Sequence, residues 1–177
     1  MKLRIVPITA AAALSAAVLF GGWFAYRHFG VEQPLDRVAQ KVPGVESAQA
    51  SMKSDQVVLT VKLNKDADLA EVYRQVKADG AQAIGSKELQ LVARNSDDPA
   101  LEKVWRSALF DVAEAMDHRK YTGIRDAMIK LEQATPGLTA SSEMDEQNVY
   151  ISLHLGDHAK YVILPRDPAK LGVWPNA

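Results

Sequence analysis

The hydrophobic pattern of the chain begins with a long apolar stretch, Ile5 to Tyr26, that contains no charged residue. As a helix rising 1.5 Å per residue it would reach roughly 33 Å, about the thickness of the hydrocarbon core of a bilayer. Lys2 and Arg4 precede it, and basic residues before a span favour a cytoplasmic N-terminus. Residues 1–30 are therefore predicted to be a signal anchor: a single-pass transmembrane helix in the cell membrane, with the globular part extracytoplasmic. A cleaved signal peptide is the alternative, because a basic start and Ala-rich triplets suit that segment too.

Small residues recur at every fourth position of this stretch, at Ala13, Ala17 and Gly21. Residues four apart lie on one face of a helix, and small side chains there allow a second helix to approach closely. This face is a candidate for association between transmembrane helices. The alternative is an Ala-rich helix in which small residues occur everywhere by composition.

Residues 31–95 show shorter periods that predict one small unit. A short helix is expected to end at Pro43-Gly44, because the residue before a proline leaves the helical region. Two strand-like runs follow, and the second alternates between apolar and polar residues. Its apolar face consists of Val57, Leu59, Val61 and Leu63. Asp68 and Glu71 then form a capping box that begins another helix, and a third strand follows it. The predicted order is αββαβ, with one face of a three-stranded sheet buried under two helices.

Residues 96–166 predict a second unit of order ααβββ. Asp98 and Pro99 begin the longest helix, whose apolar stripe is centred on Trp105. A second helix and three strands follow, with a tight turn at Gly156-Asp157. Residues 167–177 are predicted to be a C-terminal tail. Units of this size are marginal alone, so we expect the two to pack together through the helix of Trp105. The fold class is α+β, two small α/β units after a transmembrane helix.

The two units share a repeat, because residues 35–63 align with residues 128–155. Pro43-Gly44 aligns with Pro136-Gly137, in each case after a helical stripe and before a pair of strands. One residue is missing from the second hairpin turn, after which the alternating apolar residues match again. The sequence therefore predicts two copies of a helix–strand–strand unit.

Charge and composition narrow the function. After Gly30 the chain carries 22 acidic residues against 18 Lys and Arg, a formal net charge of −4. This argues against a general nucleic-acid-binding protein, which would show a basic patch. The absence of cysteine excludes disulfides, thiolate metal sites and a Cys nucleophile.

Candidate chemistry is sparse, and we predict no catalytic, cofactor-binding or metal-binding residues. His154, Asp157 and His158 at one hairpin are the nearest approach to a metal site, but two histidines on a solvent-facing tip fall short of one. The acidic clusters are explained by helix caps, solvated helix faces and turns. No phosphate-binding loop or nucleophile elbow is present. The chain is therefore predicted not to be an enzyme.

Three aromatic residues lie outside the apolar stripes and are the candidate partner surface: Tyr121, Tyr150 and Trp174. Aromatic residues are enriched in protein–protein interfaces.

The αββαβ order of residues 31–95, with Pro43-Gly44-Val45 entering its hairpin, resembles the ring-building motifs of bacterial membrane-anchored assembly proteins. These motifs occur in secretion-system and flagellar basal-body rings and in stage III sporulation proteins. The resemblance covers the first unit, and in the second only the helix–hairpin core. It implies that copies pack side by side, but it assigns no ring-forming residue.

Three functions follow, in order of preference. The first is a membrane-anchored, extracytoplasmic, non-catalytic interaction or assembly module that associates with itself or with a protein partner. The second is an extracytoplasmic sensing or ligand-binding domain with a pocket between the two units. The third is an envelope hydrolase.

Overall fold

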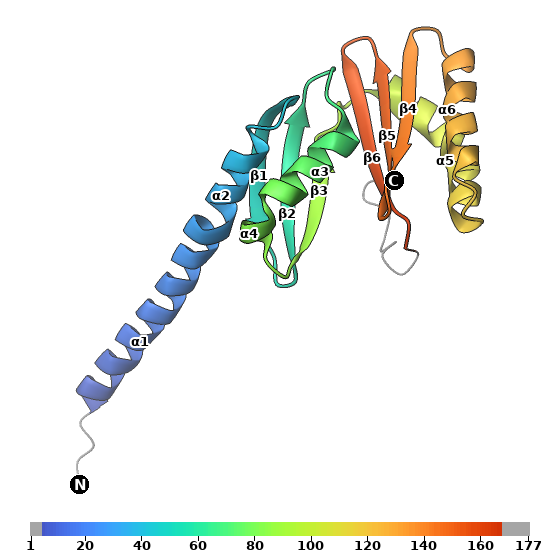
Figure 1. Ribbon diagram of the computed structural model, residues 1–177. Coiled ribbons are helices and arrows are strands. Elements are labelled where there is room, and N and C mark those ends of the chain that lie inside the picture. Colours follow the sequence, from blue (N-terminus) through green and yellow to red (C-terminus); the bar gives the residue numbers. More distant parts are fainter. Residues whose placement is uncertain (1–4, 168–177) are drawn as a thin grey trace.

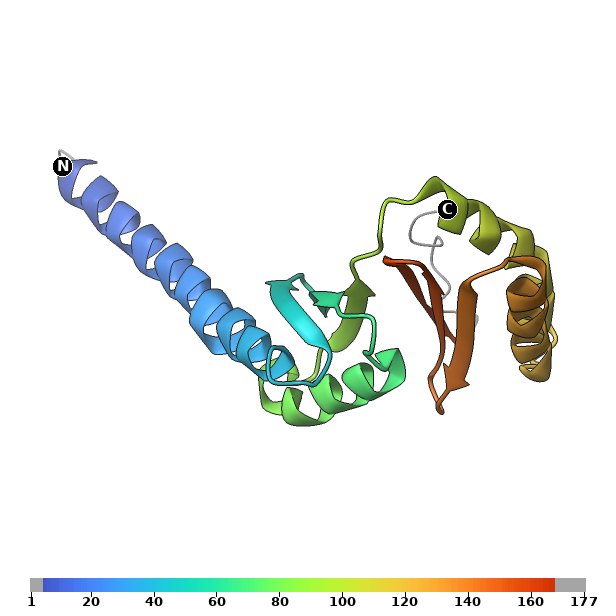
Figure 2. The same cartoon turned by 90° about the horizontal axis from the view of Figure 1, so that it is seen from above.

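The computed structural model of the chain describes residues 5–167, with side chains from Ala13 onward (Figure 1). The chain is α+β with two three-stranded sheets. Its apolar start forms helix α1, Ile5–Ala25, which continues through the π-helical segment η1, Tyr26–Glu32, into α2, Gln33–Ala39. The three segments form one continuous rod, of which α1 projects away from the sheets while η1 and α2 lie against the first sheet (Figures 1 and 2).

The prediction of a transmembrane helix is wrong. Within the described part of the chain, no helix combines the length and the apolar character needed to cross a membrane. The apolar run that includes α1 ends at Tyr26. Arg27 follows directly and introduces charge. This finding also overturns the predicted signal anchor and the single-pass location in the cell membrane with an extracytoplasmic globular part.

The first sheet has the order β1-β2-β3, with β1 antiparallel and β3 parallel to β2. Its strands and the helices between them are β1 Val45–Met52, β2 Gln56–Leu63, α3 Leu69–Asp79, α4 Ala81–Ile84 and β3 Glu88–Ala93. Alternation places Val57, Leu59 and Val61 on one face of β2, where all three are fully buried. Residues of α2, α3 and α4 join them in one core cluster, so these helices cover the same face of the sheet.

The second sheet is entirely antiparallel, in the order β4-β5-β6. It follows two helices, and the elements are α5 Pro99–Asp117, α6 Thr122–Ala134, β4 Leu138–Met144, β5 Asn148–Leu155 and β6 His158–Pro165. Val149, Ile151 and Leu153 of β5 point towards α5 and α6 and pack with Trp105 in a second core cluster. The apolar stripes of α5 and α6 therefore pack against the apolar face of β5, as the helical and strand periods of the sequence predict.

The aligned parts of the two units share their backbone turn. Gly44 and Gly137 have φ of 90° and 81°, a left-handed conformation that glycine adopts at no steric cost. Each glycine lies between a helix and the first strand of a hairpin. At the other helix ends, the carboxylates of Asp68 and Asp98 accept hydrogen bonds from the N–H groups of Glu71 and Leu101, as N-caps do.

The two units are joined differently from the prediction. Trp105 is 4% exposed, but it belongs to the core between α5, α6 and the second sheet. The first unit instead contacts the opposite face of that sheet, where Tyr150 and Tyr161 join the first core cluster. The rings of Tyr73 and Tyr150 lie 5.6 Å apart across this contact. The second sheet is therefore covered on both faces, which Figure 2 shows from above.

Candidate functional site

The predicted site residues lie in three different places. Ala13, Ala17 and Gly21 are all exposed on α1, and no atom lies within 4 Å of a Cβ built on Gly21. Tyr121 is half-buried, with the Arg166 guanidinium 4.7 Å from its ring centroid. Tyr150 is only 2% exposed, between the two units of the chain itself. Trp174 lies outside the described residues.

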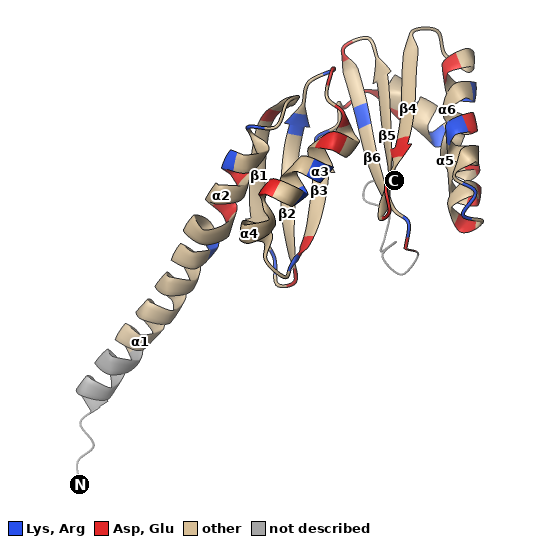
Figure 3. Cartoon of the chain, in the orientation of Figure 1, with Lys and Arg blue, Asp and Glu red and all other residues tan. Residues whose placement is uncertain are grey.

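Helix α1 presents an apolar surface on all sides. Its large exposed side chains, with those of η1, are Leu14, Val18, Leu19, Phe20, Trp23, Phe24, Tyr26 and Phe29. Phe20 is 75% exposed and Phe24 is 68% exposed. Figure 3 shows no charged residue along the described part of α1. The largest exposed apolar surface among the described residues is therefore on this rod and not on the two sheets.

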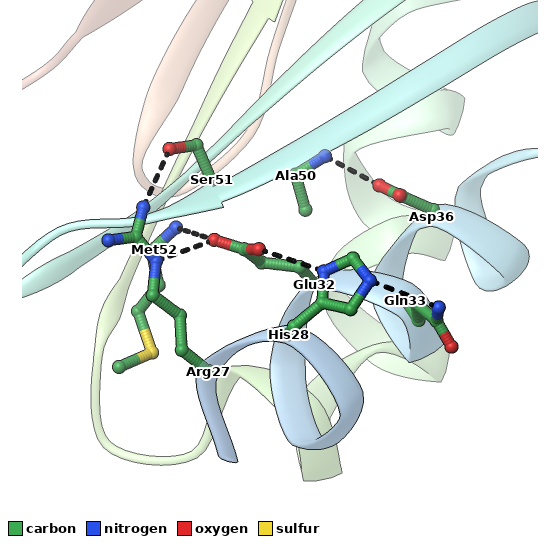
Figure 4. Close-up of polar contacts among 8 residues, drawn as sticks. All are labelled: Arg27, His28, Glu32, Gln33, Asp36, Ala50, Ser51 and Met52. Carbon is green, nitrogen blue, oxygen red and sulfur yellow. Dashed lines mark hydrogen bonds and ion pairs between the residues drawn. The ribbon is translucent and has the colours of Figure 1, made fainter. Parts of the chain in front are cut away.

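Where this rod meets β1, carboxylates cover the edge of the first sheet (Figure 4). Asp36 accepts a hydrogen bond from the Ala50 N–H at 2.5 Å, and Glu32 accepts one from the Met52 N–H at 3.1 Å. The bonded residues alternate, so these are the N–H groups of β1 that point away from β2. A strand edge with unpaired N–H groups can template pairing with another chain, and the two carboxylates close this edge.

Glu32 is also held from the side of the rod. Its carboxylate lies 2.8 Å from the Arg27 Nε and 3.5 Å from the His28 Nδ1. Burial by itself raises the pKa of Glu32, but the hydrogen bonds from Arg27 and the Met52 N–H outweigh it and lower the pKa below its usual value. Burial raises the pKa of Asp36, and the neighbouring charge of Glu32 adds to this rise against the bond from Ala50. The two carboxyl groups therefore differ: the pKa of Glu32 is lowered, whereas the pKa of Asp36 is raised.

The edge of the second sheet is covered to a smaller extent. The Ala140 N–H of β4 donates to the Glu132 carboxylate of α6 at 2.7 Å, and the Leu138 N–H donates to the Thr135 carbonyl. By the same alternation, the N–H groups of Ser142 and Met144 also point away from β5. No hydrogen bond closes these two groups among the described residues. Met144 is 48% exposed.

The two units enclose one polar cleft of about 270 Å³. On one side lie the loop before α3 and its first turn, and on the other the strands β4 and β5. Its charged or titratable lining residues are Lys65, Asp66, Asp68, Glu143, Tyr150 and His154. Burial lowers the pKa of His154 and so favours the neutral ring, against an opposing effect of Asp66. Neither Tyr73 nor Trp105 lines the cleft.

Hydrogen bonds hold the wall of this cleft in place. The Tyr150 hydroxyl donates to the Asp145 carboxylate at 2.6 Å, and Asp145 also accepts from the N–H groups of Gln147 and Asn148. Burial raises the pKa of Tyr150, and the bond to Asp145 raises it further. The Tyr161 hydroxyl donates to the Asn64 carbonyl of the first unit at 3.1 Å. The aromatic residues at the junction thus have fixed polar partners.

The hairpin histidines contact different groups. The ring of His154 packs edge-on against Tyr161 at 5.5 Å, whereas the Nε2 of His158 lies 3.6 Å from Asp98. Among the residues that the structure describes, no three His, Cys, Asp or Glu side chains are grouped to hold a metal ion.

The sequence analysis did not predict that carboxylates cover the strand edges. Glu32 and Asp36 are four residues apart and therefore share a helix face, which is a readable signal. The sequence gives no sign of which strand that face would meet, because Ala50 and Met52 lie 14 and 20 residues away.

Comparison with known proteins identifies no family. No protein-family model matches the chain, and no curated protein matches it.

Proposed function

We propose that the chain is a non-catalytic assembly module whose copies associate through the apolar surface of α1. The observation that carries this proposal is the exposure of Phe20, Trp23 and Phe24 on a helix that is apolar on all sides. Contiguous exposed apolar patches of more than a few hundred Å² mark association sites. A helix that is apolar all round is normally buried, and the two sheets of this chain do not bury α1.

One face of α1 suits packing against a second copy. Ala13, Ala17, Phe20 and Phe24 follow one another at intervals of four, three and four residues. This is the spacing with which helices interlock in coiled coils. The small residues of the face allow close approach, and the two Phe rings supply most of the apolar area. Gly21 lies at the border of the same face.

Two further observations support assembly over catalysis. The charged residues that the structure places together serve as caps, ion pairs and strand-edge acceptors. The first unit also resembles ring-building domains in which copies pack side by side, in its αββαβ order and in the Pro43-Gly44-Val45 entry to its hairpin.

The test is the mass of the full chain in solution by light scattering, for the natural sequence and for a variant with Phe20→Ser and Phe24→Ser. We expect a defined oligomer for the natural chain and a monomer for the variant. The matched control is Val18→Ser with Leu19→Ser, which removes exposed apolar side chains from other faces of α1. A monomeric natural chain, or equal dissociation of both variants, contradicts the proposal.

A second candidate function is binding of a small polar ligand in the cleft between the units. The specific observation is the cleft of about 270 Å³, whose lining carries Asp66, Asp68 and Glu143 against Lys65. This balance suits a cationic ligand. Spermidine should then raise the melting temperature of the natural chain, and it should have a smaller effect after Glu143→Gln. No shift with spermidine removes this candidate.

A further inference from the structure

The open edge of β4 is a second interaction surface, separate from α1 and independent of the function proposed above. We propose that β4 accepts an extended segment of a partner protein as an added strand, and that this segment alternates basic and apolar residues. Strand addition to a sheet edge uses main-chain hydrogen bonds for affinity and alternate side chains for specificity.

The backbone groups for this pairing are already in place. Ser142 and Met144 present outward N–H and carbonyl groups, because Ala140 two residues earlier directs its N–H outward to Glu132. The outer edges of β1 and β6 are more extensively covered. Glu32 and Asp36 close β1, while Asn95 and Ser96 bond to the N–H groups of Tyr161 and Ala159 in β6. The last residues of β4 are thus the longest open edge that the described chain presents at this sheet.

The side chains around the edge of β4 are apolar on one face of the sheet and acidic on the other. On the side of α6, Met144 is 48% exposed and Ile129 is 45% exposed. Ile129 lies three residues before Glu132 and so shares the helix face that reaches this edge. On the opposite face, Glu143 is exposed at the rim of the cleft. An added strand would therefore place apolar side chains beside Ile129 and Met144, and alternate residues beside Glu143.

The charge of the surroundings favours a basic partner. Glu132, Glu143 and Glu146 are exposed around the edge, and the carboxylate-rich end of β4 is visible in Figure 3. The two cations of α6 already have partners: Arg125 is paired with Asp126 at 3.1 Å, and Lys130 with Asp111 at 3.4 Å. Lysine or arginine in the added strand would lie beside Glu143 and Glu146, which form no ion pair among the described residues, whereas acidic residues would be repelled.

A second copy of the chain does not fit this edge. An antiparallel pair keeps facing side chains on the same side of the sheet, so the α6 helices of two copies would lie on one side. Helix α6 contacts β4, whereas α5 contacts β5 and β6. Joined edge to edge at the strand spacing of about 4.8 Å, the two α6 helices would be closer than the 8–10 Å that helix packing requires. A segment without its own covering helix avoids this clash.

The experiment uses a fluorescein-labelled peptide of alternating Lys and Val, titrated with the full chain and followed by fluorescence anisotropy. The matched control peptide alternates Glu and Val. We expect the Lys-Val peptide to bind about tenfold more tightly, and Glu143→Lys to reverse this preference. Hydrogen exchange should show new protection at the amides of Ser142 and Met144. Equal affinity for both peptides, or protection elsewhere, overturns the proposal.

Ser142→Pro removes the outward N–H without breaking the bonds between β4 and β5, since this N–H makes none of them. It should abolish peptide binding, whereas Ser142→Ala should retain it. A peptide with N-methylated valines provides a second measurement that does not depend on the stability of the variant, and it should not bind. Retained binding in either case overturns the proposal. Loss of a chain oligomer on Ser142→Pro overturns the choice of partner, because it would place a second copy at the edge.

Discussion

The strands β1 and β4 begin the hairpins of the two repeat copies, yet their outer edges differ in how many N–H groups are hydrogen-bonded. Two half-buried carboxylates, Glu32 and Asp36, close β1 beside residues that are themselves buried. One exposed carboxylate, Glu132, closes only the start of β4. The difference follows from the rod, because the first unit has η1 and α2 against its edge and the second has only the end of α6. A repeated hairpin can therefore be closed in one copy and remain available for pairing in the other.

The two sheets also differ in how their faces are covered. Helices cover one face of the first sheet, and residues on its other face are half-buried or exposed. The second sheet has α5 and α6 on one face and the first unit on the other. A core residue of the second unit should thus affect mainly its own sheet.

Trp105→Ala tests this separation and carries the largest expected effect. Loss of this buried ring should lower the free energy of unfolding by about 3–5 kcal/mol. Hydrogen exchange should show weaker protection in β4, β5 and β6 than in β1 and β2. Phe110→Ala, at a position 86% exposed on the same helix, should change the free energy of unfolding by less than about 0.5 kcal/mol. Equal loss of protection in both sheets would show that they share one core.

Asp36→Ala compared with Glu132→Ala tests the two edges directly. The first change leaves the N–H of buried Ala50 without its acceptor and should cost about 1–3 kcal/mol in urea unfolding. The second should cost less than about 1 kcal/mol, because water reaches the half-buried Ala140. Asp36→Asn keeps an acceptor oxygen and should restore part of the loss. Equal costs at both strands would remove the distinction between a closed and an open edge.

The ion pair of Lys160 and Glu102 probes the helix-covered face of the second sheet. Lys160 is 7% exposed and its Nζ lies 2.6 Å from the Glu102 carboxylate. The hydrogen bond from Lys160 holds the pKa of Glu102 below its usual value near 4.5. Its stabilisation is therefore complete above pH 4.5 and is lost as the pH falls through the lower, folded-state pKa. Glu102→Gln should cost about 1–2 kcal/mol at pH 7 and almost nothing at pH 2, measured by urea unfolding. A cost that does not depend on pH would contradict this.

His154 probes the face between the units and has the smallest expected effect. Burial lowers its pKa below the ordinary value of 6.5, so protonation opposes folding. Stability should fall as the pH drops from 6.5 towards the folded-state pKa, by a few tenths of a kcal/mol after solvent screening. His154→Gln should flatten the dependence of the melting temperature on pH between 7 and 5. His158→Gln is the control, at an exposed position on the same hairpin. An unchanged slope in the His154 variant would show that the ring is solvated.

Local patterns predicted much of the fold. The alternation of Val57, Leu59 and Val61 placed β2, and Asp68 and Asp98 are the caps that begin α3 and α5. The same reasoning failed at α1, where apolar character was taken as evidence for a membrane span. It failed again at Trp105, because a buried stripe shows that a helix packs but not which sheet it meets.

The sequence by itself determined the periodic elements, the paired Pro-Gly turns and the α+β class, because these depend on spacing between neighbouring residues. Only the tertiary structure decided what those elements meet. It brings Asp36 to Ala50, Tyr73 to Tyr150 and Asn64 to Tyr161, and it leaves Ser142 and Met144 at an open edge. The physical reason is that such contacts join residues far apart in the chain. Which of these residues come into contact depends on how the whole chain packs, and the spacing of neighbouring residues does not determine that.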